Sequence, residues 1–276
     1  MGKANELLFV HLITSSHYIE QGMSFWESRC KHLYDSRISD SVIFFPSSVT
    51  EEIFVRGKRK ESFWYPVPGC RHLVKSVHIH DSKWLKNHSS AVARCASTTW
   101  SRDYAMYSGA FFAYHLLREP ILKRYKFYVK IDMDICVHRK IPLELLFSND
   151  SRTLVSHTSI VPSSDCERNV LQATRAYKLK MMDTRRTSAW CDDIKLREII
   201  YGNFVVFNST FMTSKSVLNF TNFLYNSYGK GYFEYRWGDQ ALVPSLLCGV
   251  APLPGVSKMS LDPRVRNLKI LRDNYF

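Results

Sequence analysis

Two aspartates, two positions apart, follow a short apolar run near the middle of the chain. The run Phe127–Ile131 ends directly before Asp132, and Asp134 follows after one methionine. Side chains at positions i and i+2 of a strand point to the same side, so both carboxylates would lie at the carboxyl edge of a sheet. Carboxylate oxygens are suitable ligands for Mn²⁺ or Mg²⁺. We therefore predict a divalent metal site formed by Asp134 and Asp132, which would neutralise a leaving diphosphate.

Such a triplet also occurs by chance, and the alternative is a solvated turn that carries two surface aspartates. The apolar strand before the triplet favours the metal site, and the basic loop His138-Arg139-Lys140 follows it closely. His138 is therefore the histidine to test at this site. His11 lies in an apolar run, and we interpret it as a packed, hydrogen-bonded core residue.

A second group of residues with chemical potential lies in the aromatic segment Gly231–Gln240. Aromatic faces suit sugar rings, and a guanidinium suits phosphate. We predict that Arg236 and Trp237, together with Asp132, bind a nucleotide-sugar donor. Asp239 is the predicted catalytic residue, acting as a base on the acceptor hydroxyl. The alternative for Asp239 is a purely structural cap of the helix that follows.

Short apolar runs that alternate with helix-like segments must position these residues. The expected strands are Leu7–Ile13, Val42–Phe45, Val74–Ile79, Phe127–Ile131, Leu154–His157 and Phe204–Phe207. The expected helices are a short one from Ser48 and longer ones over Arg102–Leu117, Phe211–Tyr225 and Asp239–Leu247. This alternation predicts an α/β fold in which helices flank a mixed, mostly parallel sheet.

We expect the whole chain, residues 1–276, to form one domain. Residues 159–198 are the most polar and least regular part of the sequence. We expect them to form a flap over the site.

The formal net charge of +13 favours anionic partners. Besides a phosphate-bearing substrate, a basic nucleic-acid-binding protein without catalysis is an alternative, although no recognised nucleic-acid motif supports it. A metal-dependent phosphotransferase or hydrolase could use the same aspartates, but the sequence has no P-loop and no nucleophile elbow. A sugar transferase therefore fits the residues better than either alternative.

The cysteines and the N-terminal run bear on location. Seven widely spaced cysteines without a C-x-x-C pair predict mostly free thiols in a reducing compartment. The run Leu7–Ile13 is too short to span a bilayer and lacks the features of a signal peptide. We expect a soluble, cytoplasmic protein with no transmembrane segment.

Several segments together carry a resemblance to a known family. These are Val42-Ile43-Phe44-Phe45 with Thr50-Glu51-Glu52, Ser108–Phe112, Tyr125–Tyr128, Asn203-Phe204 and Tyr235–Asp239. The chain resembles the yeast Golgi α-1,2-mannosyltransferases (glycosyltransferase family 15) from about Val42 to Cys248. The most specific match is Tyr235-Arg236-Trp237-Gly238-Asp239, which is similar to the family's Glu-Arg-Trp-Gly-Asp. The triplet Asp132-Met133-Asp134 would occupy the place of the family's Glu-Pro-Asp metal motif.

The resemblance implies a GT-A-like fold and transfer of mannose, or of another hexose or a pentose, to a glycan or glycoprotein. It implies GDP-mannose as the first donor to test and a UDP-sugar as the second. Val205 stands where the family has a glutamate, a proposed nucleophile, and no histidine after His157 can match the family's late metal ligand. The family's membrane anchor and stem also have no counterpart. Retaining or inverting stereochemistry therefore stays open.

Overall fold

The structure is a computed structural model of the chain. The described residues are 6–13, 27–35, 39–46, 64–66, 73–79, 106–132, 135–137, 140–143, 155–157, 160–162, 169–181, 198–200, 204–228, 237, 242, 245, 246, 250 and 258–260.

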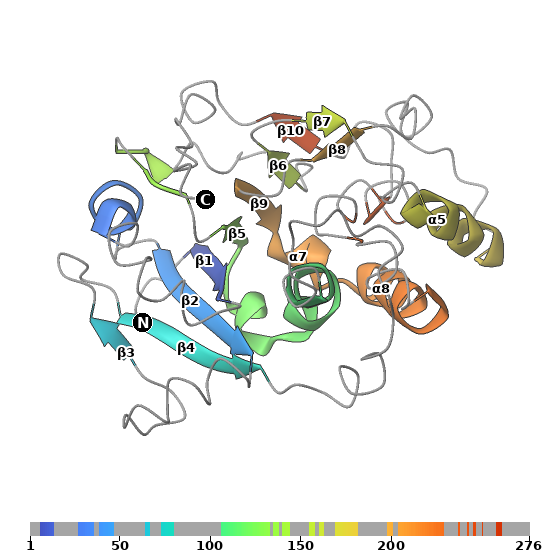
Figure 1. Ribbon diagram of the computed structural model, residues 1–276, viewed down its shortest axis with the longest axis horizontal. Helices are drawn as coiled ribbons and strands as arrows, with labels where there is room; N and C mark the ends of the chain where they lie inside the picture. Colours follow the sequence, from blue (N-terminus) through green and yellow to red (C-terminus); the bar gives the residue numbers. More distant parts are fainter. Residues whose placement is uncertain are drawn as a thin grey trace, which may run out of the picture.

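Eight strands of the described residues form one twisted sheet (Figure 1). Their order is β10 (Lys258–Ser260), β6 (Val155–His157), β9 (Phe204–Asn208), β5 (Phe127–Ile131), β1 (Leu7–Leu12), β2 (Ser39–Pro46), β4 (Leu73–Ile79) and β3 (Trp64–Pro66). The pairs β5–β1, β1–β2, β2–β4 and β10–β6 are parallel, whereas β9 and β3 run antiparallel to their neighbours. Each of the six predicted strands is present, and the predicted mixed, mostly parallel sheet is confirmed. A separate two-stranded sheet pairs β7 (Ile160–Pro162) with β8 (Glu198–Ile200).

The two faces of the central strands build two separate cores. In β1, Leu8 and Val10 enter one core cluster, whereas Leu7 and Phe9 enter the other. β5 divides in the same way, because successive side chains of a strand point to opposite faces. Strands covered on both faces must be apolar along their whole length. This requirement explains the continuous apolar runs of the sequence.

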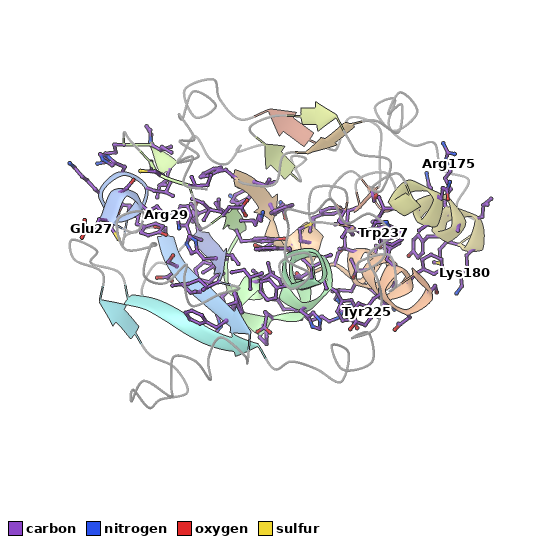
Figure 2. All side chains as sticks on the ribbon, viewed as in Figure 1. Glu27, Arg29, Arg175, Lys180, Tyr225 and Trp237 are labelled. Carbon is purple, nitrogen blue, oxygen red and sulfur yellow. The ribbon has the colours of Figure 1, made fainter. Side chains whose placement is uncertain are left out.

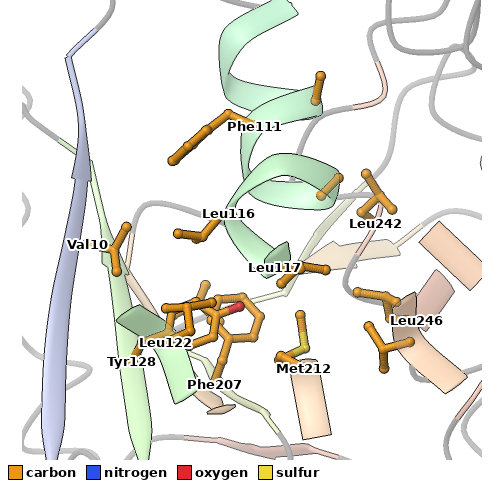
Figure 3. Close-up of a cluster of buried hydrophobic side chains, with 14 of the residues drawn as sticks. Val10, Phe111, Leu116, Leu117, Leu122, Tyr128, Phe207, Met212, Leu242 and Leu246 are labelled. Atoms are coloured by element: carbon orange, nitrogen blue, oxygen red, sulfur yellow. The ribbon is translucent and has the colours of Figure 1, made fainter. Parts of the chain in front are cut away.

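Helices cover the first core. η1 (Met106–His115) is a π-helix that continues through the short 3₁₀ turns η2 (Leu116–Arg118) and η3 (Pro120–Arg124). Figure 3 shows Phe111, Leu116 and Leu117 of these turns beside Val10, Tyr128 and Phe207 of the strands. The helix predicted over Arg102–Leu117 is therefore confirmed where it is described, but its π winding was not predicted. α7 (Ser209–Met212), α8 (Lys215–Tyr228) and α5 (Asn169–Lys180) complete this side.

One helix expectation and the expectation for residues 159–198 need correction. Phe211–Tyr225 is not one helix, because the chain breaks between α7 and α8. The Asn208 side chain accepts from the Phe211 N–H (3.0 Å) at the start of α7, and the Ser214 hydroxyl accepts from the Val217 N–H (3.4 Å) at the start of α8. Residues 159–198 are more regular than expected, because they contain β7, α5 and the first residue of β8, and the expected flap over the site stays a prediction. The helix expected from Ser48 lies outside the described residues.

Among the described residues, the second core is closed mainly by the loop that follows β5. Ile135, Val137, Ile141 and Leu143 follow β5 and bury their side chains against Leu7, Phe9 and Phe127 of the strands. Leu33, directly after a helical turn at residues 27–32, joins the same cluster. The chain that follows the predicted metal triplet is thus part of the core. Within the described residues, no helix is both long and apolar enough to cross a membrane.

Candidate functional site

Asp132 stands directly after β5, in the middle of the sheet. Its carboxylate Oδ1 lies 2.6 Å from the Lys130 ammonium, and 24% of the Asp132 side chain remains exposed. Lys130 itself is only 2% exposed and lies 5.0 Å from the centre of the Phe112 ring. Because an ammonium that is removed from water needs a partner, Lys130 holds the Asp132 carboxylate at this edge of the sheet. The carboxylate is anchored on one side and accessible on the other.

Arg29 holds the backbone around the triplet from beneath. This fully buried side chain donates through Nη2 to the Asp132 carbonyl (2.6 Å) and through Nε to the Ile135 carbonyl (3.0 Å). The Ile135 N–H also donates to the Asp132 carbonyl (3.3 Å). These bonds bracket residues 133–134, which lie outside the described residues. One guanidinium therefore holds the backbone at Asp132 and at Ile135.

Other residues of the helical turn at 27–32 bind the same loop further along. The Ser28 hydroxyl donates to the Val137 carbonyl and accepts from the Val137 N–H, both at 2.7 Å. The His32 carbonyl accepts from the Ile141 N–H at 2.9 Å. We call this set of contacts, from Ser28, Arg29 and His32 to the backbone of residues 132–141, the loop clasp. Figure 2 labels Glu27 and Arg29 at this turn, at the left of the view beside β2.

A covalent bond also holds this turn. Cys30 is disulfide-bonded, and its partner cysteine lies outside the described residues. The expectation of mostly free thiols is therefore wrong for Cys30. Cys136, in the clasped loop, is a free thiol whose Sγ lies 3.2 Å from the Ser28 hydroxyl.

A polar network supports Arg29 from the strand side. Arg29 Nη1 lies 3.4 Å from His11 Nδ1, while His11 Nε2 lies 2.9 Å from the Tyr34 hydroxyl and 3.2 Å from the Ser41 hydroxyl. Burial, and then the charge of Arg29, lower the pKa of His11 well below 6.5, so His11 is neutral. Burial raises the pKa of Tyr34 to about 12, so its phenol stays protonated. The interpretation of His11 as a hydrogen-bonded core residue is confirmed.

Trp237 lies in the other core. Its side chain is 2% exposed and packs in the first cluster with Leu242 and Leu246, which are helical. Figure 2 places Trp237 near α5 and α8, across the central strands from Arg29. The structure therefore does not bring Trp237 beside the loop after Asp132, and it gives the indole a packing role. Asp134, Arg236, Asp239 and His138 lie outside the described residues.

The described residues fit one edge of a metal site. Asp132 offers a partly exposed carboxylate, the ligand chemistry that Mn²⁺ and Mg²⁺ prefer. Among the residues that the structure describes, no three or more His, Cys, Asp or Glu side chains gather to form a complete site. Further ligands for a metal at Asp132 would have to come from the rest of the chain, where the sequence predicts Asp134.

Two residues of this site were missed in the sequence. Lys130 interrupts an otherwise apolar strand two positions before Asp132, and this spacing is a usable signal for a pair on one side of the strand. Arg29 has no such signal. Its carbonyl partners lie more than 100 residues away along the chain, in the fold's second core.

The comparisons with known proteins bear on the fold. No protein-family model matches the sequence, and no curated protein sequence is similar to it. Among solved structures, core-mannan synthase A from Aspergillus fumigatus, in an Mn/GDP form, aligns with 94% of this chain and 73% of its own (TM-score 0.67, 12% identity). The mannosyltransferase Ktr4p from S. cerevisiae in complex with GDP aligns with 91% of this chain and 68% of its own (TM-score 0.60, 14% identity). A second structure of Ktr4p gives a TM-score of 0.63 at 13% identity, over 91% of this chain and 67% of its own. The GT-A-like fold expected from the sequence is confirmed.

Proposed function

We propose that this chain is a metal-dependent glycosyltransferase that moves a sugar from a nucleotide-sugar donor to a hydroxyl of a glycan or glycoconjugate. One observation carries the proposal: the Asp132 carboxylate stands partly exposed at the end of the central strand β5, held by Lys130 and by the clasped backbone. The carboxyl ends of parallel strands are where open α/β sheets bind ligands. The alignments over at least 91% of the chain support one domain over residues 1–276.

Asp132 and Asp134 are the residues that would hold the divalent ion. When bound, Mn²⁺ or Mg²⁺ would supply positive charge to the departing nucleoside diphosphate. Lys130 keeps the Asp132 carboxylate at the open edge, while the Lys130 side chain itself stays buried. Arg29 and Ser28 keep the following backbone from moving away.

GDP-mannose is the first donor in this proposal, and a UDP-sugar is the second. The sequence resemblance supports GDP-mannose, and two structures with this fold carry GDP, one of them with Mn. Arg236 is proposed to contact the donor phosphates, and Asp239 to orient or deprotonate the acceptor hydroxyl. Trp237, proposed from the sequence as a donor contact, would act indirectly, because its buried indole anchors the segment that carries Arg236 and Asp239.

A calorimetric titration tests the donor. GDP, UDP, GDP-mannose and UDP-sugars would be titrated with and without Mn²⁺, and hydrolysis of each nucleotide sugar would be measured beside the binding. We expect GDP and GDP-mannose to bind only when Mn²⁺ is present. Tight UDP binding without GDP binding would make a UDP-sugar the donor in place of GDP-mannose. Turnover in excess EDTA would refute metal dependence.

A further inference from the structure

We propose that Arg29 is a positioning residue that preorganises the metal-binding loop and thereby sets its metal affinity. The inference rests on the proposed function, because it takes Asp132 as a metal ligand. Arg29 never meets the metal or the substrate in this scheme. It acts through the backbone carbonyls of Asp132 and Ile135.

The geometry of the guanidinium carries the first step. Nε and Nη2 lie on one rigid planar fork, and they donate to two carbonyls that stand three residues apart. A planar fork fixes the separation and the orientation of both carbonyls together. The backbone at Asp132 and at Ile135 is therefore tied to one rigid group.

Burial carries the second step. Arg29 and His11 are both 0% exposed. The third guanidinium nitrogen, Nη1, lies 3.4 Å from His11 Nδ1. Removing a guanidinium from water is costly, and an apolar side chain of similar volume would fill the space at lower cost. The fold therefore keeps a charge where packing alone does not require one. We infer that its value lies in holding the loop in one conformation.

The surrounding charge carries the third step. Lys130 reaches the Asp132 carboxylate and Arg29 reaches the Asp132 carbonyl, so two cations hold one residue from different sides. Two positive groups offset the negative charge of the aspartates at this edge before any metal arrives. The loop can then keep its binding geometry in the empty state, and metal binding does not have to order it.

The loop clasp offers a clean way to remove this function alone. Ser28, His32 and the disulfide of Cys30 still hold the helical turn when Arg29 is changed. Arg29→Lys keeps the charge but loses the planar fork, so one ammonium cannot reproduce the geometry of both bonds. Arg118→Met is the matched control, because Arg118 also binds backbone carbonyls but joins η2 to α8.

The experiment measures Mn²⁺ affinity by calorimetry with the metal alone, together with kcat, KM and the midpoint of thermal unfolding. For Arg29→Lys we expect Mn²⁺ affinity to fall about 10-fold or more at a temperature where circular dichroism shows the variant to be folded. The thermal midpoint should fall as well, because a buried carbonyl loses its donor. Arg118→Met should lower the thermal midpoint and leave Mn²⁺ affinity unchanged. Arg29→Lys with wild-type Mn²⁺ affinity would overturn the proposal.

Two further outcomes separate this proposal from the proposed function. If the wild type binds no Mn²⁺ and hydrolyses no nucleotide sugar, the proposed function fails and takes this inference with it. If Arg29→Lys does not fold, Tyr34→Phe loosens the same network by removing the 2.9 Å contact to His11. That variant should lose Mn²⁺ affinity a few-fold, and an unchanged affinity would refute the positioning role.

Discussion

Arg29 and Arg118 perform similar chemistry in two regions of the molecule. Arg118 donates through Nη1 to the Tyr114 carbonyl (2.6 Å), and through Nη2 to the Leu218 carbonyl (3.3 Å) and to the Asn222 side chain (2.7 Å). Each arginine also has a histidine beside it. The pKa of His115 is lowered to about 4, first by burial and then by the charge of Arg118, as that of His11 is lowered beside Arg29.

The two arginines differ in burial and in what they hold. Arg29 is fully buried and fixes a loop, whereas Arg118 is partly exposed and joins the end of η2 to α8. Arg118 is supported by the Tyr114 ring, which lies 3.5 Å from its guanidinium carbon and stacks on Tyr225 at 3.9 Å between ring centres. Similar bonds join helices in one region. In the other region they fix the backbone beside a partly exposed carboxylate.

The largest effect should come from the carboxylates that Arg29 is proposed to position. We expect Asp134→Ala to abolish transfer and Asp132→Ala to weaken it by about 10³-fold, because each change removes a metal ligand. Transfer rates and circular dichroism would be measured for both variants and for Glu27→Ala, an exposed carboxylate on the helical turn. Glu27→Ala should behave as the wild type. Unchanged transfer in both aspartate variants would contradict the proposal that Asp132 and Asp134 bind the metal.

Asp239 tests the acceptor side of the same site. If it orients or deprotonates the acceptor hydroxyl, Asp239→Asn should lower transfer by about 10²–10⁴-fold while GDP and Mn²⁺ affinities stay nearly intact. Asparagine caps a helix almost as well as aspartate, so a purely structural role predicts wild-type transfer. Steady-state kinetics beside calorimetry distinguish these two roles.

Arg118→Met should affect stability alone. The change removes hydrogen bonds to the Leu218 and Tyr114 carbonyls, so we expect a loss of about 1–3 kcal/mol in the free energy of unfolding. Urea denaturation would measure this loss, and nucleotide-sugar hydrolysis would be followed in parallel. A fall in kcat at an unchanged folded fraction would mean that the Arg118 region also serves the site.

The last prediction concerns the pH dependence of the free energy of unfolding. The pKa of His115 is about 4 in the folded chain and close to the ordinary value of 6.5 in the unfolded chain. Between these pH values the unfolded chain therefore binds more protons. The free energy of unfolding should therefore be greatest above pH 6.5 and fall as the pH drops toward 4. In His115→Gln the free energy of unfolding should fall less between pH 7 and pH 4, by on the order of 2 kcal/mol. An identical slope in the variant would show that His115 does not contribute.

The sequence predicted the strands well, because strands buried on both faces must be apolar along their length. It failed at α5, where few apolar residues mark the buried side: Val170, Ala173 and Tyr177 are buried beside the polar Thr174. It also failed at Arg29, since a pattern along the chain cannot report hydrogen bonds to carbonyls more than 100 residues away. Asp132 was predicted at the end of its strand and is found there, whereas its metal-binding role stays a prediction. The roles of Asp134, Arg236 and Asp239 stay predictions as well.

The position of β1 has a consequence for how the chain folds. β1 pairs with β2 from residue 39 and with β5 only from residue 127, so one edge of this buried strand stays open during much of synthesis. β6 must likewise wait for β10, about 100 residues later. Long-range strand pairing slows folding and leaves apolar edges exposed to other chains. We expect slow refolding, and aggregation that increases with protein concentration until β5 docks.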